Sequence, residues 1–189
     1  MSTAPTGPLV VLVGPPGSGK STVAAILARA WGVAHRDTDD DVERTAGKPV
    51  ADIFVTDGEP AFRALEREAV VTAVREHDGV LSLGGGAVLD PDSRRVLADY
   101  AEAGGTVVFL DVSLAHAAPR VGFNQSRPLL LGNPRARWQA LMNERRAVYE
   151  QVATTTVLTD ARTPEQVAAE IAADPRTDAR VTPAPQEEQ

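Results

Sequence analysis

The chain has 189 residues, a net charge of −7 and no cysteine. That length suits one globular domain with a full core, and the lack of cysteine excludes disulfides, thiolate zinc sites and thiol nucleophiles. The acidic balance argues against a general nucleic-acid surface, and the sequence holds neither an apolar run long enough to span a bilayer nor a signal-type N-terminus. We therefore expect a cytoplasmic protein that binds neither nucleic acid nor a membrane. We also expect a monomer.

Short segments rich in valine, isoleucine and leucine alternate with helix-like segments along the chain. Strands are expected at 9–13, 34–38, 80–83, 106–111 and 155–159, and helices at 20–31, 39–45, 60–76, 91–103, 114–120, 134–152 and 164–173. The strands show little polar alternation, which indicates that both faces of their sheet are covered. The pattern predicts an α/β fold with a parallel sheet, whose ligands gather at the carboxyl ends of the strands.

Both ends of the chain differ in composition from the segment between them. Residues 1–8 hold proline, glycine, serine and threonine, and residues 174–189 hold prolines and a terminal pair of glutamates. We expect both to be disordered tails around a folded domain at 9–173.

Between the first strand and the first helix stands a glycine-rich loop. Its sequence is Gly14-Pro15-Pro16-Gly17-Ser18-Gly19-Lys20-Ser21, followed by Thr22, and it fits the phosphate-loop pattern G-x-x-x-x-G-K-[ST]. Backbone N–H groups of such a loop surround phosphate oxygens, the lysine adds positive charge, and the serine hydroxyl can ligate Mg²⁺. A chance glycine turn is the alternative, which the strand before the loop and the helix after it disfavour. The loop predicts binding of a nucleoside triphosphate with Mg²⁺.

Two acids, Asp37 and Asp39, follow the second expected strand. In extended chain they would point the same way, so that one could hold Mg²⁺ and the other could accept a proton from an attacking hydroxyl. The alternative is that this acidic run caps the next helix. We favour a functional role for both, and we expect Asp40 and Asp41 to be solvated.

The third expected strand runs into Gly84, Gly85 and Gly86. Consecutive glycines at this edge of the sheet suggest backbone N–H groups presented to an anion or a close ligand, and a flexible connection is the alternative. Arg63 precedes Glu66 by three residues on an expected helix, a spacing that by itself indicates a surface ion pair of little energy.

Arginines also surround an irregular segment at 122–130. Arg120, Arg127 and Arg145 flank or lie within it, and its glycine, asparagine and proline suggest a mobile lid. An arginine in a lid can offset charge on a transferring phosphoryl group, whereas a plain surface loop is the alternative. The histidines show no ligand spacing, and Trp138 and Tyr149 are expected to serve packing.

Taken together, these motifs resemble the shikimate kinase family. The resemblance rests on G-P-P-G-S-G-K-S-T, D-T-D, A-D-I-F, D-G-E-x-x-F-R, L-S-L-G-G-G-A and R-P-L-L in this order. It implies an ATP-dependent kinase that transfers the γ-phosphoryl group to the 3-hydroxyl of shikimate, on the route to chorismate and aromatic amino acids. It also implies a five-stranded parallel sheet flanked by helices, of the nucleoside-monophosphate-kinase type, with a lid at about 119–132 and a substrate-binding segment.

The same resemblance implies roles for individual residues. Lys20, Asp39 and Arg127 would be catalytic, with Asp39 binding the shikimate hydroxyls as the candidate base and Arg127 reaching the phosphates from the lid. The ATP site would comprise the phosphate loop with Thr22, and Arg120 and Arg162 beside the adenine; Ser21 and Asp37 would serve Mg²⁺. Shikimate would contact Asp39, Arg63, Gly84, Gly85, Gly86 and Arg145, with Glu66 orienting Arg63.

Three alternatives remain open from the sequence. A gluconate kinase or a nucleoside-monophosphate kinase would share the phosphate loop, and a nucleotide-dependent regulatory module would lack transfer chemistry. The chain holds no N-K-x-D guanine motif, which disfavours a GTPase switch. At the carboxylate site, either Arg145 or the adjacent Arg146 could face the acceptor, and the resemblance favours Arg145.

Overall fold

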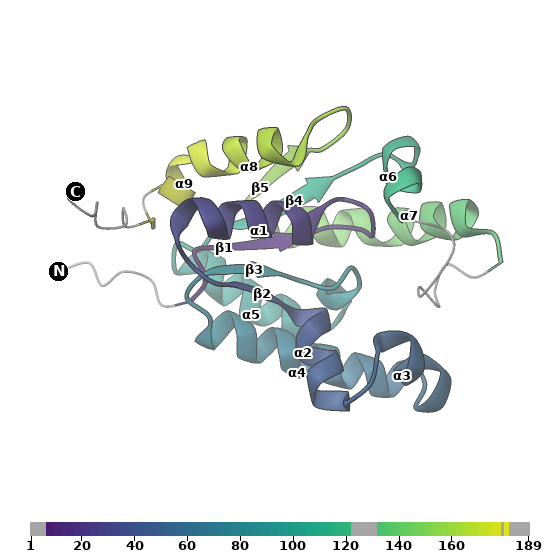
Figure 1. The fold of residues 1–189 in the computed structure, drawn as a ribbon. Coiled ribbons are helices and arrows are strands. Elements are labelled where there is room, and N and C mark those ends of the chain that lie inside the picture. Colours follow the sequence, from purple (N-terminus) through teal and green to yellow (C-terminus); the bar gives the residue numbers. More distant parts are fainter. Residues whose placement is uncertain (1–6, 122–131, 179, 182–189) are drawn as a thin grey trace.

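Five parallel strands form one sheet, in the order β2-β3-β1-β4-β5 (Figure 1). The structure, a computed structural model, describes residues 7–121, 132–178, 180 and 181. The strands are β1 (Val10–Val13), β2 (His35–Asp37), β3 (Val80–Ser82), β4 (Val107–Asp111) and β5 (Thr155–Leu158). The predicted five-stranded parallel sheet is thus confirmed.

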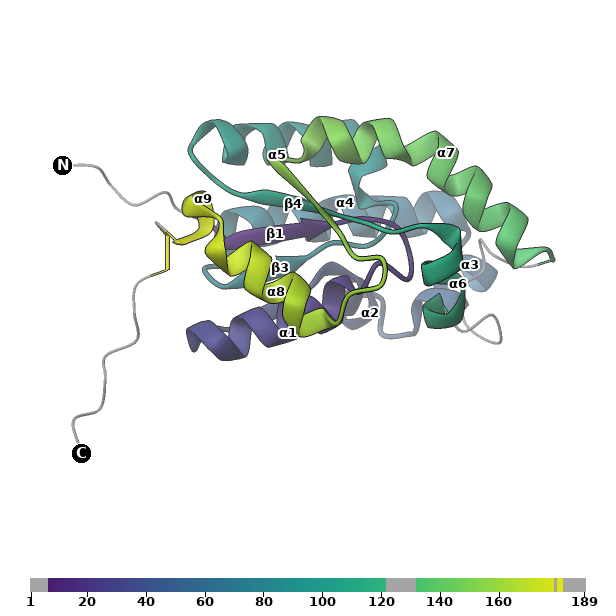
Figure 2. The same ribbon diagram turned by 90° about the horizontal axis from the view of Figure 1, so that it is seen from above.

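Helices cover both faces of this sheet (Figure 2). One face packs against α1 (Lys20–Trp31) and α8 (Pro164–Ala173). The other face packs against α4 (Glu59–Glu76), α5 (Pro91–Glu102) and α7 (Pro134–Val152). Buried side chains alternate between these two cores along β1, where Val11 and Val13 face one layer and Val10 and Leu12 face the other. This two-sided burial explains why the strands lack polar alternation.

Shorter elements complete the fold at the carboxyl edge of the sheet. They are α2 (Thr38–Ala46), α3 (Val50–Thr56), the 3₁₀ turn η1 (Ala87–Leu89) and α6 (Leu114–Val121). A small third core of Val42, Ile53 and Phe62 joins α2, α3 and α4. Helix α3 is absent from the predicted elements, because its seven residues are too few to show a helical period.

The C-terminal segment departs from its expectation. Residues Pro175–Asp178 form a short helix, α9, in a stretch expected to be a disordered tail. Thr177 is buried, and Arg180 donates to the carbonyl of Gly7 and lies over the ring of Tyr100. The prediction is therefore wrong for the start of this segment, because α9 packs onto α8. No helix in the described ranges is long and apolar enough to cross a membrane.

Candidate active site

The phosphate loop joins β1 to α1 and closes over the amino end of that helix. Gly17 and Gly19 have φ values of 82° and 90°, in the left-handed region that side chains disfavour. A Cβ on Gly17 would lie 2.7 Å from Cγ2 of Val121, so the loop also packs closely on α6. Gly19 caps α1 without a side-chain hydrogen bond, which leaves the first N–H groups of the helix available to an anion.

Two side chains of this loop carry the polar groups expected of a phosphate site. The Lys20 side chain folds back over the loop, and its ammonium donates to the carbonyls of Gly14 and Pro15 at 2.8 and 3.1 Å. The hydroxyl of Ser18 is buried and has no hydrogen-bond partner within the described part of the chain. A buried hydroxyl in this position suits a phosphate oxygen, because an unmade hydrogen bond there is costly.

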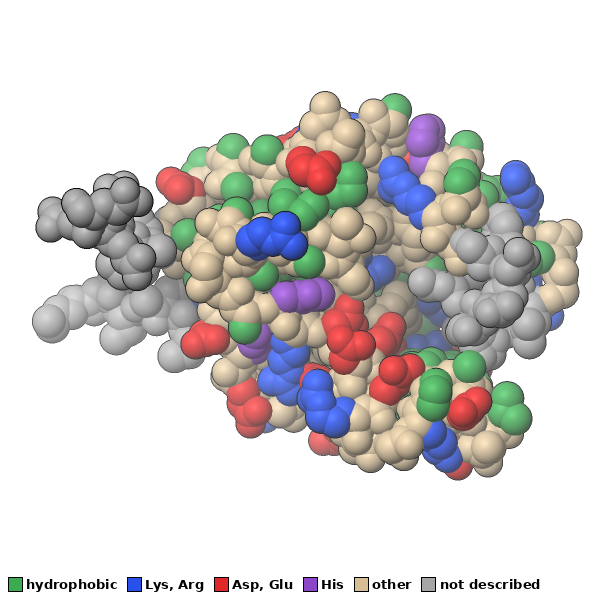
Figure 3. Space-filling view, viewed as in Figure 1, with side chains coloured by type: hydrophobic (Ala, Val, Ile, Leu, Met, Phe, Trp, Pro, Cys, Tyr) green, Lys and Arg blue, Asp and Glu red, His purple; other side chains and the backbone are tan. Residues whose placement is uncertain are grey.

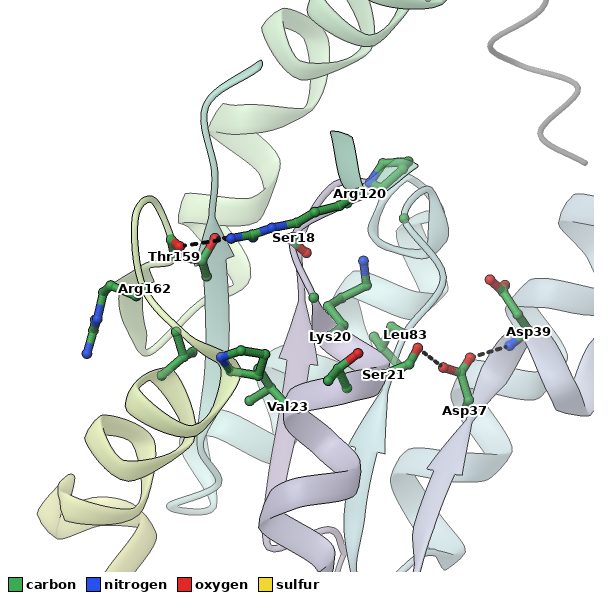
Figure 4. Close-up of a pocket in the computed structure, with 17 residues that line it drawn as sticks. Ser18, Lys20, Ser21, Val23, Asp37, Asp39, Leu83, Arg120, Thr159 and Arg162 are labelled. Atoms are coloured by element: carbon green, nitrogen blue, oxygen red, sulfur yellow. Dashed lines mark hydrogen bonds between the residues drawn. The ribbon is translucent and has the colours of Figure 1, made fainter. Parts of the chain in front are cut away.

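A cavity of about 430 Å³ opens beside the loop (Figure 4). Its lining combines the phosphate loop with Asp37 and Asp39 on one side and with Arg120 and Arg162 on the other. In the space-filling view, acidic side chains gather beside a hollow in which Lys and Arg side chains are visible (Figure 3). The fold therefore gathers the residues of four separate sequence motifs around one space.

Asp37 links the phosphate loop to the neighbouring strands. Its Oδ2 accepts hydrogen bonds from Ser21 Oγ at 2.8 Å and from Ser82 Oγ at 2.6 Å. Its Oδ1 accepts from the backbone N–H of Asp39 at 3.0 Å, so Asp37 also caps α2. Asp37 and Asp39 were expected to lie together in extended chain. They do not, because α2 begins at Thr38. The same carboxylate therefore caps α2 and binds the side chain of Ser21 in the phosphate loop.

Asp41 is not solvated, contrary to expectation. It is buried at 5% exposure, and its two oxygens form ion pairs with Arg36 at 2.6 Å and with Arg44 at 2.7 Å. Its position one turn into α2 turns the carboxylate toward the preceding strand, which local sequence does not reveal. Asp40, by contrast, is exposed as predicted.

The Arg63–Glu66 pair is largely buried rather than a surface pair. Nη1 of Arg63 lies 2.6 Å from Oε2 of Glu66, and the Glu66 residue is only 3% exposed. Burial raises the pKa of Glu66 even though Arg63 opposes the change. Burial acts to lower the pKa of Arg63, but Glu66 and Glu59 outweigh it and the pKa is raised. The Arg63 side chain therefore stays positively charged, and its pairing with Glu66 holds it in a partly buried position.

The glycine run makes room for these side chains. A Cβ on Gly84 would lie 2.5 Å from Oδ1 of Asp39 and 2.8 Å from Oε1 of Glu66, and a Cβ on Gly86 would clash with the guanidinium of Arg63. The N–H of Gly84 donates to Oγ1 of Thr38, so it is not presented to an anion as expected. Gly84 and Gly86 are required chiefly because charged side chains pass close to the backbone there.

Arg145 and Arg146 point to different surroundings. Arg145 is 4% exposed and lies close enough to Glu66 and Tyr149 to act on both of their pKa values. Its buried Nε has no hydrogen-bond partner among the residues that the structure describes. Arg146 instead forms two hydrogen bonds of 2.8 Å with Asp111. Arg145 is thus the arginine on the side of Arg63.

The two arginines expected beside the adenine lie around the carboxyl end of β5 (Figure 4). Arg120 donates to the side chain and the carbonyl of Thr159, at 3.4 and 3.3 Å. Arg162 donates to the carbonyl of Leu158 and pairs with Glu170. Arg127 and most of the expected lid at about 119–132 lie outside the described residues.

Two aromatic residues that were expected to serve packing also donate hydrogen bonds to the loops of the site. Trp138 Nε1 donates to the carbonyl of Pro16 at 2.8 Å, and the Tyr149 hydroxyl donates to the carbonyl of Gly85. Both donors come from α7, remote in sequence from the loops that they contact. Their helical spacing looks the same as that of core residues, so no local signal distinguishes them.

Comparisons with known proteins point to a single family. A family model described as shikimate kinase matches residues 16–175. The shikimate kinase of Salinispora arenicola is 56% identical over 166 residues, covering 88% of this chain and 96% of the relative. That of Streptomyces coelicolor is 54% identical over 162 residues, covering 86% and 92%. A solved structure of the shikimate kinase from Acinetobacter baumannii in complex with shikimate aligns with a TM-score of 0.82 at 31% identity, covering 89% of this chain and 92% of that one.

Proposed function

Since this chain belongs to the shikimate kinase family, we propose that it transfers the γ-phosphoryl group of ATP to the 3-hydroxyl of shikimate, giving shikimate 3-phosphate and ADP. The product feeds the synthesis of chorismate and the aromatic amino acids. The observation that carries the proposal is that the fold brings Lys20, Asp39 and Arg63 into one region of the molecule. Lys20 and Asp39 line one cavity. The carboxylates of Asp39 and Glu66 both lie beside the Cα of Gly84. Glu66 in turn forms an ion pair with Arg63.

The residues present fit ATP and Mg²⁺. The loop 14–21 offers backbone N–H groups, the Lys20 ammonium and the buried Ser18 hydroxyl to the phosphates. Ser21 and Asp37, whose oxygens are 2.8 Å apart, are oxygen donors of the kind that Mg²⁺ prefers. These two residues would hold Mg²⁺, which would supply positive charge to offset the charge on the phosphates during transfer. Arg120 and Arg162 would flank the adenine at the other end of the cavity.

The acceptor is positioned by charge. Arg63 and Arg145 would hold the carboxylate of shikimate, with Gly84, Gly85 and Gly86 beside its ring. Because Glu66 is buried against Arg63, the guanidinium is fixed before the acceptor arrives, which lowers the entropy cost of binding.

Phosphoryl transfer then needs a proton acceptor and charge compensation more than covalent chemistry. Asp39 would bind the hydroxyl groups of shikimate and accept the proton of the attacking one. Lys20 would stabilise charge on the transferred group, and Arg127 would add to this from the lid by resemblance to the family.

A coupled assay of ADP release tests the proposed function. Shikimate, gluconate and nucleoside monophosphates would be compared as acceptors, with ATP and Mg²⁺ held in excess. We expect kcat/KM for shikimate to exceed that for the other acceptors by at least about 10³-fold, because they leave buried polar groups of the site unpaired. Equal or greater turnover of gluconate or a nucleotide would reject shikimate as the substrate.

We also propose that the enzyme acts as a monomer in the cytoplasm, without nucleic-acid or membrane partners. Light scattering of the purified full chain at working concentration tests the monomer, and a mass of twice the chain or more would contradict it.

A further inference from the structure

One face of α7 reaches both halves of the active site. Its buried residues are Trp138, Met142, Arg145, Tyr149 and Val152, which follow the spacing of a single helical face. Trp138 and Tyr149 are separated by about three helical turns, or about 16 Å along the axis. The first donates into the phosphate loop and the second into the glycine run.

The contact of Trp138 sets the direction of a peptide group. The described peptide bonds are trans, so the carbonyl of Pro16 and the N–H of Gly17 point in opposite directions. Holding this carbonyl against α7 turns the Gly17 N–H away from α7. Gly17 itself lines the cavity and packs on α6, so the direction of its N–H is constrained from two sides.

Tyr149 does the same for the glycine run. Its hydroxyl donates to the carbonyl of Gly85, which turns the N–H of Gly86 away from α7. The Tyr149 ring is fully buried and stacks on Phe109 at 5.1 Å between centroids, so its hydroxyl has little freedom. Burial raises its pKa to about 12, with Arg145 opposing, and the hydroxyl therefore remains a donor at any working pH.

The two held peptides lie next to each other. A Cβ on Gly85 would be 3.2 Å from Cδ of Pro16, so the phosphate loop and the glycine run touch at the residues whose carbonyls α7 holds. A shift of either loop would alter the separation of the bound groups, and small misplacements of reacting groups are costly.

We infer that Trp138 and Tyr149 are positioning residues. From one face of α7 they hold the phosphate loop, which binds the nucleotide, and the glycine run, which binds the acceptor, at a fixed separation. The assignment of ligands to the two loops rests on the proposed function. Neither side chain needs to touch a reacting atom, because each acts through the peptide group that it holds.

Equilibrium binding measurements distinguish the effect of Trp138 on the phosphate loop from that of Tyr149 on the glycine run, without any need for turnover. ADP and shikimate would be titrated calorimetrically into the parent and into Trp138→Phe, Tyr149→Phe and the control Met142→Leu, which alters the same buried face without a hydrogen bond. We expect Trp138→Phe to weaken ADP binding about five- to ten-fold while shikimate binding changes less than about two-fold. Tyr149→Phe should show the converse, and Met142→Leu should change neither.

Parent-like ADP affinity in Trp138→Phe, or equal losses in Met142→Leu, would overturn the inference. Loss of both affinities together in each variant would also overturn it, because it would indicate general repacking. If the parent binds ADP but does not phosphorylate shikimate, the proposed function fails while the ADP measurement still tests Trp138.

A second measurement covers the case in which Trp138→Phe does not fold. The variant Trp31→Phe leaves Trp138 as the sole tryptophan, so exchange of its indole N–H with solvent can be followed by NMR. Because coupling between sites is reciprocal, saturating ADP should slow this exchange at least about three-fold. An unchanged rate would contradict the link between Trp138 and the nucleotide loop.

Discussion

The guanidinium of Arg63 packs directly on the Cα of Gly86, so closely that a methyl group on that carbon would overlap Nη1. Backbone strain is not the reason for glycine here, because Gly86 has an ordinary φ of −99°. The glycine instead leaves room for the Arg63 guanidinium at the position where it pairs with Glu66.

Gly86→Ala should therefore displace Arg63. We expect the KM for shikimate to rise about ten-fold, the loss of one charge-assisted contact, with the KM for ATP nearly unchanged. Steady-state kinetics with each substrate varied would measure this. Gly104→Ala is the control, because nothing lies within 4 Å of its Cβ position and its cost is limited to the backbone. Equal effects on both substrates would contradict the role given to Gly86.

Lys20→Ala should abolish turnover and leave the fold intact. The ammonium lies over the phosphate loop, and its loss should lower kcat by more than about 100-fold. Lys48→Ala provides a matched control, since Lys48 is the other lysine of the chain and pairs with Asp57 beside α3. Assays and thermal unfolding of both variants decide the point; retained catalysis in Lys20→Ala would reject its role.

Asp39→Asn should separate catalysis from nucleotide binding. An amide cannot accept the hydroxyl proton, so kcat should fall about 10²- to 10⁴-fold while ADP affinity stays within about two-fold. The exposed neighbour Asp40, changed to asparagine, should behave like the parent. If ADP affinity falls as far as kcat, Asp39 acts on the metal or the fold instead of on the acceptor.

Adjacent arginines offer a test of the carboxylate site. Arg145→Ala should raise the KM for shikimate about ten-fold or more, because a buried cation near Arg63 is lost. Arg146→Ala should not, because that side chain pairs with Asp111. An analogue with a neutral amide in place of the carboxylate should bind poorly to the parent and lose little more in Arg145→Ala. The reverse order of the two variants would show that Arg146 holds the acceptor.

His35 should lower the free energy of unfolding in mildly acidic solution. Its Nε2 lies 2.9 Å from Ser82 Oγ, and burial lowers its pKa below the usual 6.5, with Asp37 and Asp40 opposing. The unfolded state therefore takes up the proton first as the pH falls through 6.5, and the free energy of unfolding decreases from there toward the lower folded-state pKa.

Urea unfolding of the parent and of His35→Gln between about pH 8 and pH 5 would measure this decrease. The part due to His35 should vanish in the variant, and the two proteins should show parallel pH dependence above about pH 7.5. An equally steep decrease in His35→Gln would assign the effect to other groups.

Local sequence determined the order of the strands and helices and the place of the phosphate loop. Buried strands, helix periods and glycine-rich turns leave their pattern within a few residues, so the bounds of α1, α7 and α8 match their predictions. The topology of a parallel sheet then gathers the strand ends, which accounts for Asp37 lying beside Ser21.

Tertiary structure decided which charges are buried and which groups touch across the fold. Nothing in the sequence around Asp41 distinguishes its buried carboxylate from the exposed one of Asp40. The hydrogen-bond donors on α7 contact loops that are far away in the sequence. A buried tryptophan has the same helical spacing whether or not its indole N–H donates a hydrogen bond, as that of Trp138 does to the carbonyl of Pro16. Such contacts depend on how the layers pack, because burial and hydrogen bonding are set by neighbours in space and not by neighbours in sequence.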